Sequence, residues 1–206
     1  GTGIFDAART LYREAIPLAL DPNDAAAAFS YAERSRTRVG QLATAAEMQK
    51  RLRGSGAAIV EIVALDGELA AFALTENGLT FARHPIDEKE LARLTSAASR
   101  GERKACAQLY DAVLRSSESA FAKARHLIIV ADPILDGVPF GALYDSATQS
   151  HLVERIAVSM ALSASSLQAR PHTRPGTILA VALPSGEGTG SIALPRASRE
   201  LADVQA

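Results

Sequence analysis

Residues 126–144 read HLIIVADPILDGVPFGALY, an apolar run followed by a turn-rich segment. Its apolar run, residues 127–131, has no polar alternation, so both faces of the expected strand should be buried, as in a sheet covered by helices. Asp132-Pro133 ends the run, and Asp136-Gly137 marks a turn. Because open α/β sheets usually place their sites at the carboxyl ends of strands, the stretch predicts an inner strand with a candidate site at its end.

Further elements are expected on both sides of this strand. Two strands follow it, at about residues 155–160 and 177–183, and a glycine-containing loop at 184–190 precedes a final helix. Three helices precede it. Asp87 is expected to cap the first of them, with Glu90 as its capping-box partner. The other two are expected around residues 105–114 and from Ser116 or Ser117 onward.

An antiparallel meander is expected before these helices. Strand-like patterns cover residues 57–65, 68–75 and 79–84. Asp66-Gly67 and Asn77-Gly78 separate them, and these dipeptides are strong hairpin signals. The sum of the patterns is an α/β protein in which later strands alternate with helices or long crossovers.

The N-terminal region, residues 1–50, shows two amphipathic helical patterns. The sequence DPND at residues 21–24 separates them, with Asp21 or Asn23 expected to cap the second helix. Two such helices joined by a short loop predict a helical hairpin, the unit of helical repeats. The charged run ERSRTR at residues 33–38 is expected to form a solvated face.

Composition narrows the classes of function. Of 206 residues, 48% are hydrophobic, and 22 basic residues against 23 acidic ones leave a net charge of −1, so no nucleic-acid partner is expected. No apolar run approaches the roughly 20 residues of a membrane span, and no signal peptide opens the chain. These features predict a cytoplasmic protein without a membrane partner. The chain starts without methionine and stops within a helical pattern, so we expect both ends to be cuts.

The residues that most often carry chemistry show no catalytic pattern. Cys106 is in helical register with Leu109 and Val113, which predicts a buried, unreactive thiol. A lone cysteine cannot form an intramolecular disulfide or a thiolate zinc site. Asp132 and Asp136 are expected to be turn formers. The remaining candidates lack metal spacing or a nucleophile elbow: His84, His126, His151, His172, Ser163, Ser165 and Ser166.

No metal site or cofactor is expected. The glycines at positions 186, 188 and 190 lack the Gly-Lys-Ser/Thr ending of a phosphate-binding loop, so a nucleotide-binding α/β domain is the weakest interpretation.

Taken together, several motifs resemble the CHAT domain, the caspase-like domain found beside tetratricopeptide repeats (TPRs). The sequence FSYAERSR at residues 29–36 is similar to the last helix before such a domain, and the meander is similar to its start. The resemblance covers about residues 25–206. Its other motifs are Leu109-Tyr110, the run 127–130 with Asp132, Leu135, Pro139-Phe140 and Ala142-Leu143, then residues 152–154, 163–165, Leu194-Pro195 and Glu200.

The resemblance implies a fold and a domain division. The expected fold is a helical hairpin followed by an antiparallel meander and part of a caspase-like mixed sheet flanked by helices. Residues 1–50 would be the end of a TPR-like region, which would bind protein or peptide partners. Residues 55–206 would be the N-terminal part of the CHAT domain. With later strands missing, we expect an open sheet edge that favours self-association.

The resemblance also implies which chemistry is absent. The family's dyad consists of a histidine in a His-Gly pair after one strand and a cysteine in a Ser-Ala-Cys run after the next. No His-Gly pair exists here, and Ala105-Cys106, the one Ala-Cys pair, lies upstream on a helix. The chain is therefore predicted to be the scaffold portion of a caspase-like cysteine peptidase, with no catalytic residue and no activity alone.

Asp132 is the candidate for an acidic substrate pocket, because several relatives of this fold cleave after arginine or lysine. The alternative function is a non-catalytic protein–protein interaction module.

Overall fold

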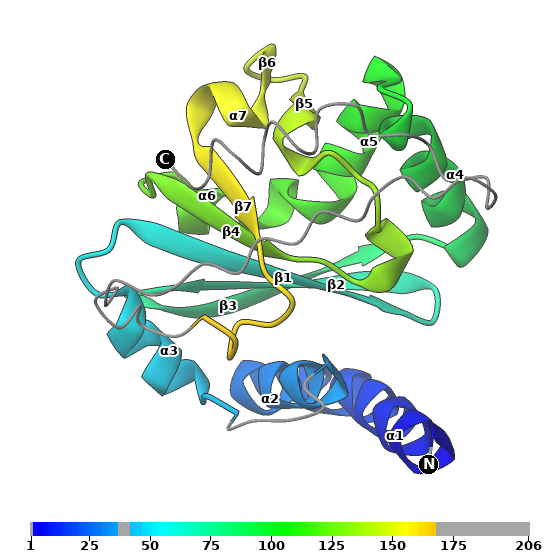
Figure 1. Cartoon of the computed structure of the whole chain (residues 1–206), viewed down its shortest axis with the longest axis vertical. Coiled ribbons are helices and arrows are strands. Elements are labelled where there is room, and N and C mark those ends of the chain that lie inside the picture. Colours follow the sequence, from blue (N-terminus) through cyan, green and yellow to red (C-terminus); the bar gives the residue numbers. More distant parts are fainter. Residues whose placement is uncertain (1, 37–41, 168–206) are drawn as a thin grey trace, which may run out of the picture. The chain divides into compact units, whose positions relative to one another are not determined.

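A computed structural model describes residues 2–36 and 42–167 of the chain. Its centre is a five-stranded mixed sheet in the order β3-β2-β1-β4-β7 (Figure 1). β1 pairs antiparallel with β2 and parallel with β4, and β4 pairs parallel with β7. The strands of this sheet are β1 (Ala57–Leu65), β2 (Glu68–Thr75), β3 (Gly78–Pro85), β4 (His126–Val130) and β7 (Ala157–Met160), and a separate hairpin joins β5 (Tyr144–Asp145) to β6 (Ser150–His151). The predicted mixed α/β class is confirmed.

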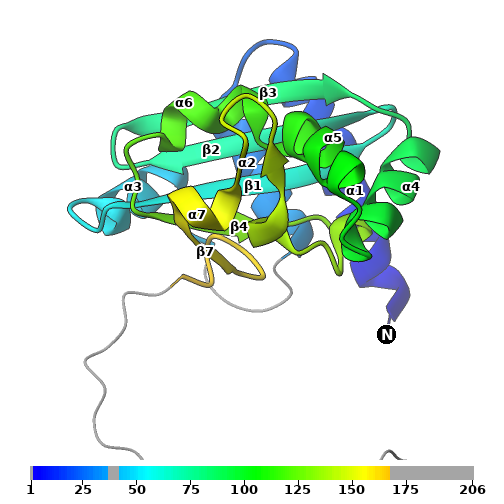
Figure 2. The ribbon, with the colours of Figure 1, turned by 90° about the horizontal axis from the view of Figure 1, so that it is seen from above.

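Helices cover both faces of the sheet (Figures 1 and 2). α1 (Thr2–Leu20), α2 (Ala25–Arg36) and α3 (Ala45–Leu52) lie on one face. On the other face lie α4 (Glu88–Ser99), α5 (Arg103–Val113), α6 (Glu118–Phe121) and α7 (Leu152–Arg155). Three short 3-10 turns, η1 (Arg115–Ser117), η2 (Pro133–Leu135) and η3 (Phe140–Ala142), complete the described elements.

The two faces of β1 carry the two halves of the hydrophobic core, because successive side chains of a strand point to opposite sides. Ile59 and Val63 pack toward α1–α3, with Phe29 and Phe72 in the same cluster. Val60, Ile62 and Ala64 belong to the cluster that includes the buried residues of α4 and α5. β1 and β4 are thus inner strands buried on both faces, and for β4 this is what the unbroken apolar run before Asp132 predicts.

The meander is confirmed, with one correction at its second turn. Leu65 pairs with Glu68, so Asp66-Gly67 forms the predicted two-residue turn, and Gly67 has the positive φ of 72° that favours glycine there. In the second hairpin Thr75 pairs with Gly78, so the turn is Glu76-Asn77 and Gly78 is the first residue of β3. Cross-strand pairing therefore shifts this turn by one residue from the predicted Asn77-Gly78.

The N-terminal helices differ from the prediction in two ways. Neither Asp21 nor Asn23 caps α2; the cap is Asp24, whose Oδ1 accepts a hydrogen bond from the Ala27 amide at 2.9 Å. The region predicted to form the second helix of residues 1–50 contains two helices, α2 and α3. Thr44 begins α3 with a capping box, in which Thr44 and Glu47 exchange side-chain-to-backbone hydrogen bonds.

Elsewhere the boundaries shift for local reasons. Asp87 caps α4 as predicted, but the Glu90 carboxylate pairs with Arg93 instead of closing a capping box. β7 begins only at Ala157, because the chain from Leu152 to Arg155 forms α7. Several predictions lie outside the described residues: the strand at 177–183, the loop at 184–190, the final helix and His172.

Residues 1–168 form one compact unit, in which the N-terminal helices pack directly on the sheet. The division into a TPR-like region at 1–50 and a domain from 55 onward stays a prediction. Among the described helices, none combines the length and apolarity that a membrane span requires.

Candidate functional site

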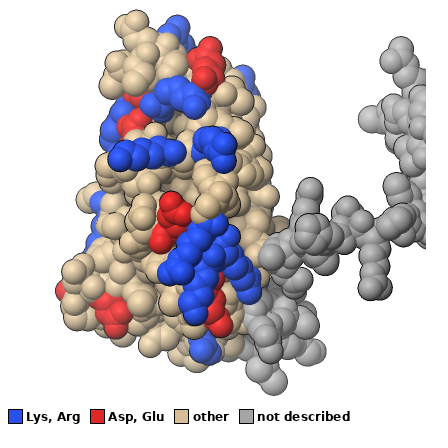
Figure 3. Space-filling view, turned by 90° about the vertical axis from the view of Figure 1, so that its left-hand side faces the viewer, with Lys and Arg blue, Asp and Glu red and all other residues tan. Residues whose placement is uncertain are grey.

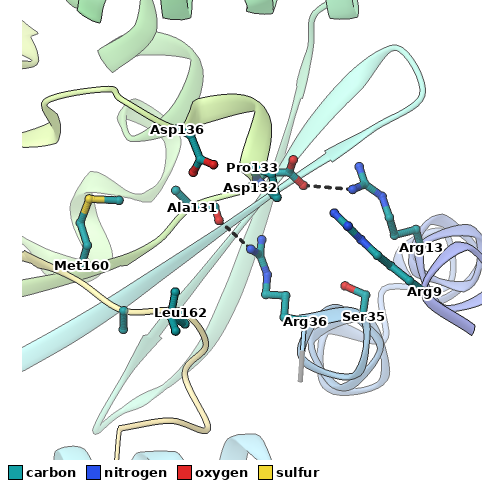
Figure 4. Close-up of a pocket in the computed structure, with 11 residues that line it drawn as sticks. Arg9, Arg13, Ser35, Arg36, Ala131, Asp132, Pro133, Asp136, Met160 and Leu162 are labelled. Atoms are coloured by element: carbon teal, nitrogen blue, oxygen red, sulfur yellow. Dashed lines mark hydrogen bonds and ion pairs between the residues drawn. The ribbon is translucent and has the colours of Figure 1, made fainter. Parts of the chain in front are cut away.

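A cavity of about 460 Å³ lies where β4 and β7 end (Figure 4). The end of β4 contributes Ala131 and the turn after it, and the end of β7 contributes Met160 and the residues that follow. Helices α1 and α2 close the other side. The lining residues are Arg9, Arg13, Ser35, Arg36, Ala131, Asp132, Pro133, Asp136, Met160, Ala161 and Leu162. Its place at the carboxyl ends of parallel strands is the one predicted for a site from the sequence.

Two arginines of the helical hairpin attach to the strand ends. Arg36 donates from Nε to Glu61 at 3.0 Å and from Nη1 to the Ala131 carbonyl at 2.6 Å. Arg13 donates to the carbonyl oxygen of Ala64 and lies 3.4 Å from the Asp132 carboxylate. These contacts satisfy carbonyl groups at the ends of β1 and β4, and they fix α1 and α2 against the candidate site.

Asp132 performs the turn role that the sequence predicts. Its Oδ1 accepts a hydrogen bond from the Ile134 amide at 3.2 Å, which caps η2. Its Oδ2 accepts from the Ala64 amide at 3.1 Å, beside Arg13. The residue is 4% exposed, and both carboxylate oxygens already have partners. A role of Asp132 in holding a basic substrate side chain stays a prediction.

The charged run that begins at Glu33 is not a solvated face, and this expectation was wrong for two of its described members. Glu33 is 1% exposed, and its two carboxylate oxygens accept the amides of Ala164 and Ser165 at 2.8 and 2.7 Å. The Arg36 side chain is 11% exposed. Residues 37 and 38 lie outside the described part. The sheet and the loop after β7 bury these groups, which helical periodicity alone does not reveal.

A second carboxyl group, that of Glu61, lies beside Arg36 on β1. Glu61 is fully buried, and one of its oxygens has no hydrogen-bond partner in the described part of the chain. Burial raises the pKa of Glu61 well above its ordinary value, and the neighbouring Glu33 carboxyl raises it further, while Arg36 acts in the opposite direction. The sequence contains a signal for this buried carboxyl group, because Glu61 is the one charged residue in the apolar run AAIVEIVAL.

A separate ionic network holds α5, α7 and the β5–β6 hairpin together on the other face of the sheet. Asp145 is fully buried and lies 2.6 Å from Arg115 and 3.3 Å from Arg155. Arg155 also donates to the Tyr110 hydroxyl at 2.5 Å, and burial raises the pKa of Tyr110 to about 12. Such a network of matched charges joins secondary-structure elements.

The histidines and serines singled out in the sequence have structural contacts. His126 Nε2 lies 2.8 Å from the Ser159 hydroxyl across β4 and β7, and His151 Nδ1 lies 2.9 Å from the Ala142 carbonyl. The Ser165 hydroxyl accepts the Ala43 amide at 2.9 Å. Ser163 and Ser166 close a turn by hydrogen-bonding each other. None of these serines lies in a strand-to-helix elbow.

Cys106 is buried, as predicted, with 3% of its surface exposed. Its Sγ lies 3.9 Å from the Ala98 carbonyl, and burial raises the pKa of the thiol. We therefore expect a thiol reagent such as DTNB to label the native chain at least about a hundred times more slowly than the chain unfolded in guanidinium, since labelling requires local opening. Labelling at equal rates in the two states would contradict this placement of α5.

Charges on the surface are mixed. On the face shown in Figure 3, basic side chains lie in small groups with acidic side chains beside them. This distribution fits the near-zero net charge of the sequence.

Comparison with known proteins identifies one family. The model of the CHAT domain matches residues 103–206, just over half of the chain. The match begins at the first residue of α5 and includes β4, β7 and the loops that line the cavity from the strand ends. A search of curated proteins finds no match.

Proposed function

The chain belongs to the CHAT domain family, and from this we propose that it is the N-terminal scaffold portion of a caspase-like cysteine peptidase, inactive by itself. The observation that carries the proposal is the combination of this family match with a cavity at the carboxyl ends of the parallel strands β4 and β7. The scaffold would hold the loops at the strand ends, and the family's dyad would come from later strands.

The described residues support the second half of the proposal. Covalent peptide cleavage needs a thiol or hydroxyl within hydrogen-bonding reach of a base, together with donors for the oxyanion. Within residues 2–36 and 42–167, the one thiol, Cys106, is buried in α5 with a backbone carbonyl as its hydrogen-bond partner. His126 and Ser159 contact each other, and this contact joins the neighbouring strands β4 and β7.

We also propose that the N-terminal helices are the end of a TPR-like region that binds protein or peptide partners. α1 and α2 form a helical hairpin, and Tyr12 of α1 stacks on Tyr31 of α2 with ring centroids 6.4 Å apart. Leu11 and Leu18, one heptad apart on α1, are 66% and 72% exposed. Large apolar side chains exposed on one side of a helix favour packing against another element.

A non-catalytic interaction module is the second candidate function. Among the described strands, none pairs with the free side of β7. Met160, the last residue of β7, is 57% exposed, and Leu162 after it is 90% exposed. An open strand edge with exposed apolar side chains favours association with another chain, including a second copy. The genomic sequence downstream of Ala206 separates the two functions. Strands ending in His-Gly and then Ser-Ala-Cys would support the peptidase, and a stop codon would support the module.

We expect the 206-residue chain to cleave none of a panel of fluorogenic peptides, including peptides with a basic residue before the scissile bond. A longer natural chain that includes the two later segments should cleave at least one of them. The Cys106→Ala variant of the longer chain should keep that activity, because Cys106 is not the nucleophile. Turnover by the 206-residue chain that disappears in Cys106→Ala would overturn both the proposal and the placement of Cys106.

A further inference from the structure

Arg9 is the basic residue of the cavity lining that has no side-chain partner among the described residues. The residue is exposed, and in the part of the chain that the structure describes no hydrogen bond or ion pair engages its guanidinium. Figure 4 shows the side chain extending from α1 toward the strand ends, between Arg13 and Arg36. Those two arginines are anchored to backbone carbonyls and carboxylates. Arg9 therefore has its donors available for a ligand.

The charges around Arg9 favour an anion. Three guanidinium groups converge on the cavity from α1 and α2. Of the two acidic side chains that line it, Asp132 is buried and engaged by Arg13 and two amides, and only Asp136 is exposed. Glu61, the carboxyl partner of Arg36, is fully buried and is not among the residues that line the cavity. The wall formed by the helices is thus positively charged, and water and ligands reach it from the cavity.

We propose that this cavity binds the carboxylate of an acidic side chain in a peptide, with the Arg9 guanidinium as the donor. A guanidinium offers two parallel N–H groups that match a carboxylate, and such charge-assisted pairs are stronger than neutral hydrogen bonds. Arg13 and Arg36 are held in place by their own partners, and they add positive charge near the bound carboxylate. Asp136, on the side of the β4 turn, repels a second negative charge and directs the carboxylate toward α1 (Figure 4).

The rest of the lining fits a peptide. Met160 and Leu162, which line the cavity, are 57% and 90% exposed. They offer apolar contact to the residues that flank the acidic one. A cavity of about 460 Å³ is large enough for one side chain with part of its backbone. Free inorganic anions would gain the charge but not this apolar contact.

The inference goes beyond the proposed function, because binding requires neither a dyad nor cleavage. It also differs from the basic specificity that Asp132 predicts, since the Asp132 carboxylate is already engaged by Arg13. The two ideas predict opposite charges for the bound side chain, and a binding measurement decides between them.

The test measures binding of labelled peptides to the 206-residue chain by fluorescence anisotropy. The peptides have the sequence Ala-Leu-X-Leu-Ala, amidated at the C-terminus, with X as Glu, Gln or Lys. A fourth peptide has X as Ala and a free C-terminal carboxylate. Each is measured against the unchanged chain and the variants Arg9→Gln and Arg9→Lys. Arg93→Gln is the matched control, since Arg93 is an exposed arginine on α4 with a simple surface pair to Glu90.

We expect the Glu peptide to bind at least about ten-fold more tightly than the Gln peptide, the ratio that one charge-assisted hydrogen bond typically gives. The preference should disappear in Arg9→Gln, persist in part in Arg9→Lys, stay unchanged in Arg93→Gln and weaken with salt. Tightest binding of the free-acid peptide would show that a chain terminus is the source of the carboxylate and would overturn the side-chain assignment. Equal binding of Glu and Gln peptides, tighter binding of the Lys peptide, or an unaffected Arg9→Gln variant would overturn the proposal itself.

Discussion

Replacing Asp145 by asparagine is expected to lower the free energy of unfolding by about 3 kcal/mol. Removing one partner of a buried ion pair typically costs 3–5 kcal/mol, because the other charge is left without compensation. The lower end applies here, since water screens the Arg115 and Arg155 side chains, which are 35% and 28% exposed, and Asp111 and Glu118 still pair with them. Asparagine has nearly the same size as aspartate. The loss in free energy of unfolding therefore measures the effect of the missing charge and not that of a cavity. Urea unfolding followed by circular dichroism measures it.

Asp111→Asn is the matched control for this change. Asp111 pairs with the same Arg115, but its side chain is 53% exposed. We expect this variant to lose less than about 1 kcal/mol, as is usual for surface ion pairs. Equal losses in the two variants would mean that the burial of Asp145 does not matter.

The stability difference between the unchanged chain and Asp145→Asn should also depend on pH, and this gives an independent check. Burial acts to raise the pKa of Asp145, but hydrogen bonds from Arg115, Thr148 and the Ala147 amide outweigh it, so the pKa lies below its ordinary value of 3.8. A carboxyl group with a lowered pKa stabilises the fold above its unfolded-state pKa, and this stabilisation is lost as the pH falls. The stability difference between the unchanged chain and Asp145→Asn should therefore be constant near neutral pH and shrink below about pH 4.

Replacing Glu33 by alanine is expected to cost about 2–6 kcal/mol and to release the loop after β7. The amides of Ala164 and Ser165 donate to Glu33, and Ala164 is fully buried while Ser165 is 8% exposed. A buried amide without a partner costs about 1–3 kcal/mol, and two of them are left by this change. Glu33→Gln should cost less than alanine, because its carbonyl oxygen still accepts one of the two amides.

Hydrogen exchange separates this explanation from general destabilisation. In Glu33→Ala, the amides of Ala164 and Ser165 should lose protection more than those of β1, because only the loop loses its acceptor. Glu90→Ala is the control, since the Glu90 carboxylate pairs with Arg93 at the surface; its melting temperature should stay that of the unchanged chain. If the two loop amides kept their protection in Glu33→Ala, Glu33 would not be what holds the loop.

The amino-acid sequence determined the elements whose information is local. The pattern of residues 57–65 and 68–75, with Asp66-Gly67 between them, specifies a hairpin whose bounds match those of β1 and β2. The register of Cys106 with Leu109 and Val113 specifies the buried face of α5. In each case the decisive residues lie in one helix or in two strands that follow each other in the sequence. The hydrophobic period and the residues of the turn are therefore enough to predict the element. The resemblance to the CHAT domain also rests on such linear motifs.

Tertiary structure alone decided what surrounds the strand ends. The parallel pairing of Val60 with Ile129 joins segments 69 positions apart, and the contact of Glu33 with Ala164 spans 131 positions. Contacts of this kind cover Glu33 and most of the Arg36 side chain in the charged helical run, and Arg9, Arg13 and Arg36 come together at the ends of β1 and β4. The physical reason is that the burial of an ionisable side chain depends on the partners that compensate it. Here those partners are backbone amides, carbonyls and charges from remote segments, whose meeting no local pattern encodes.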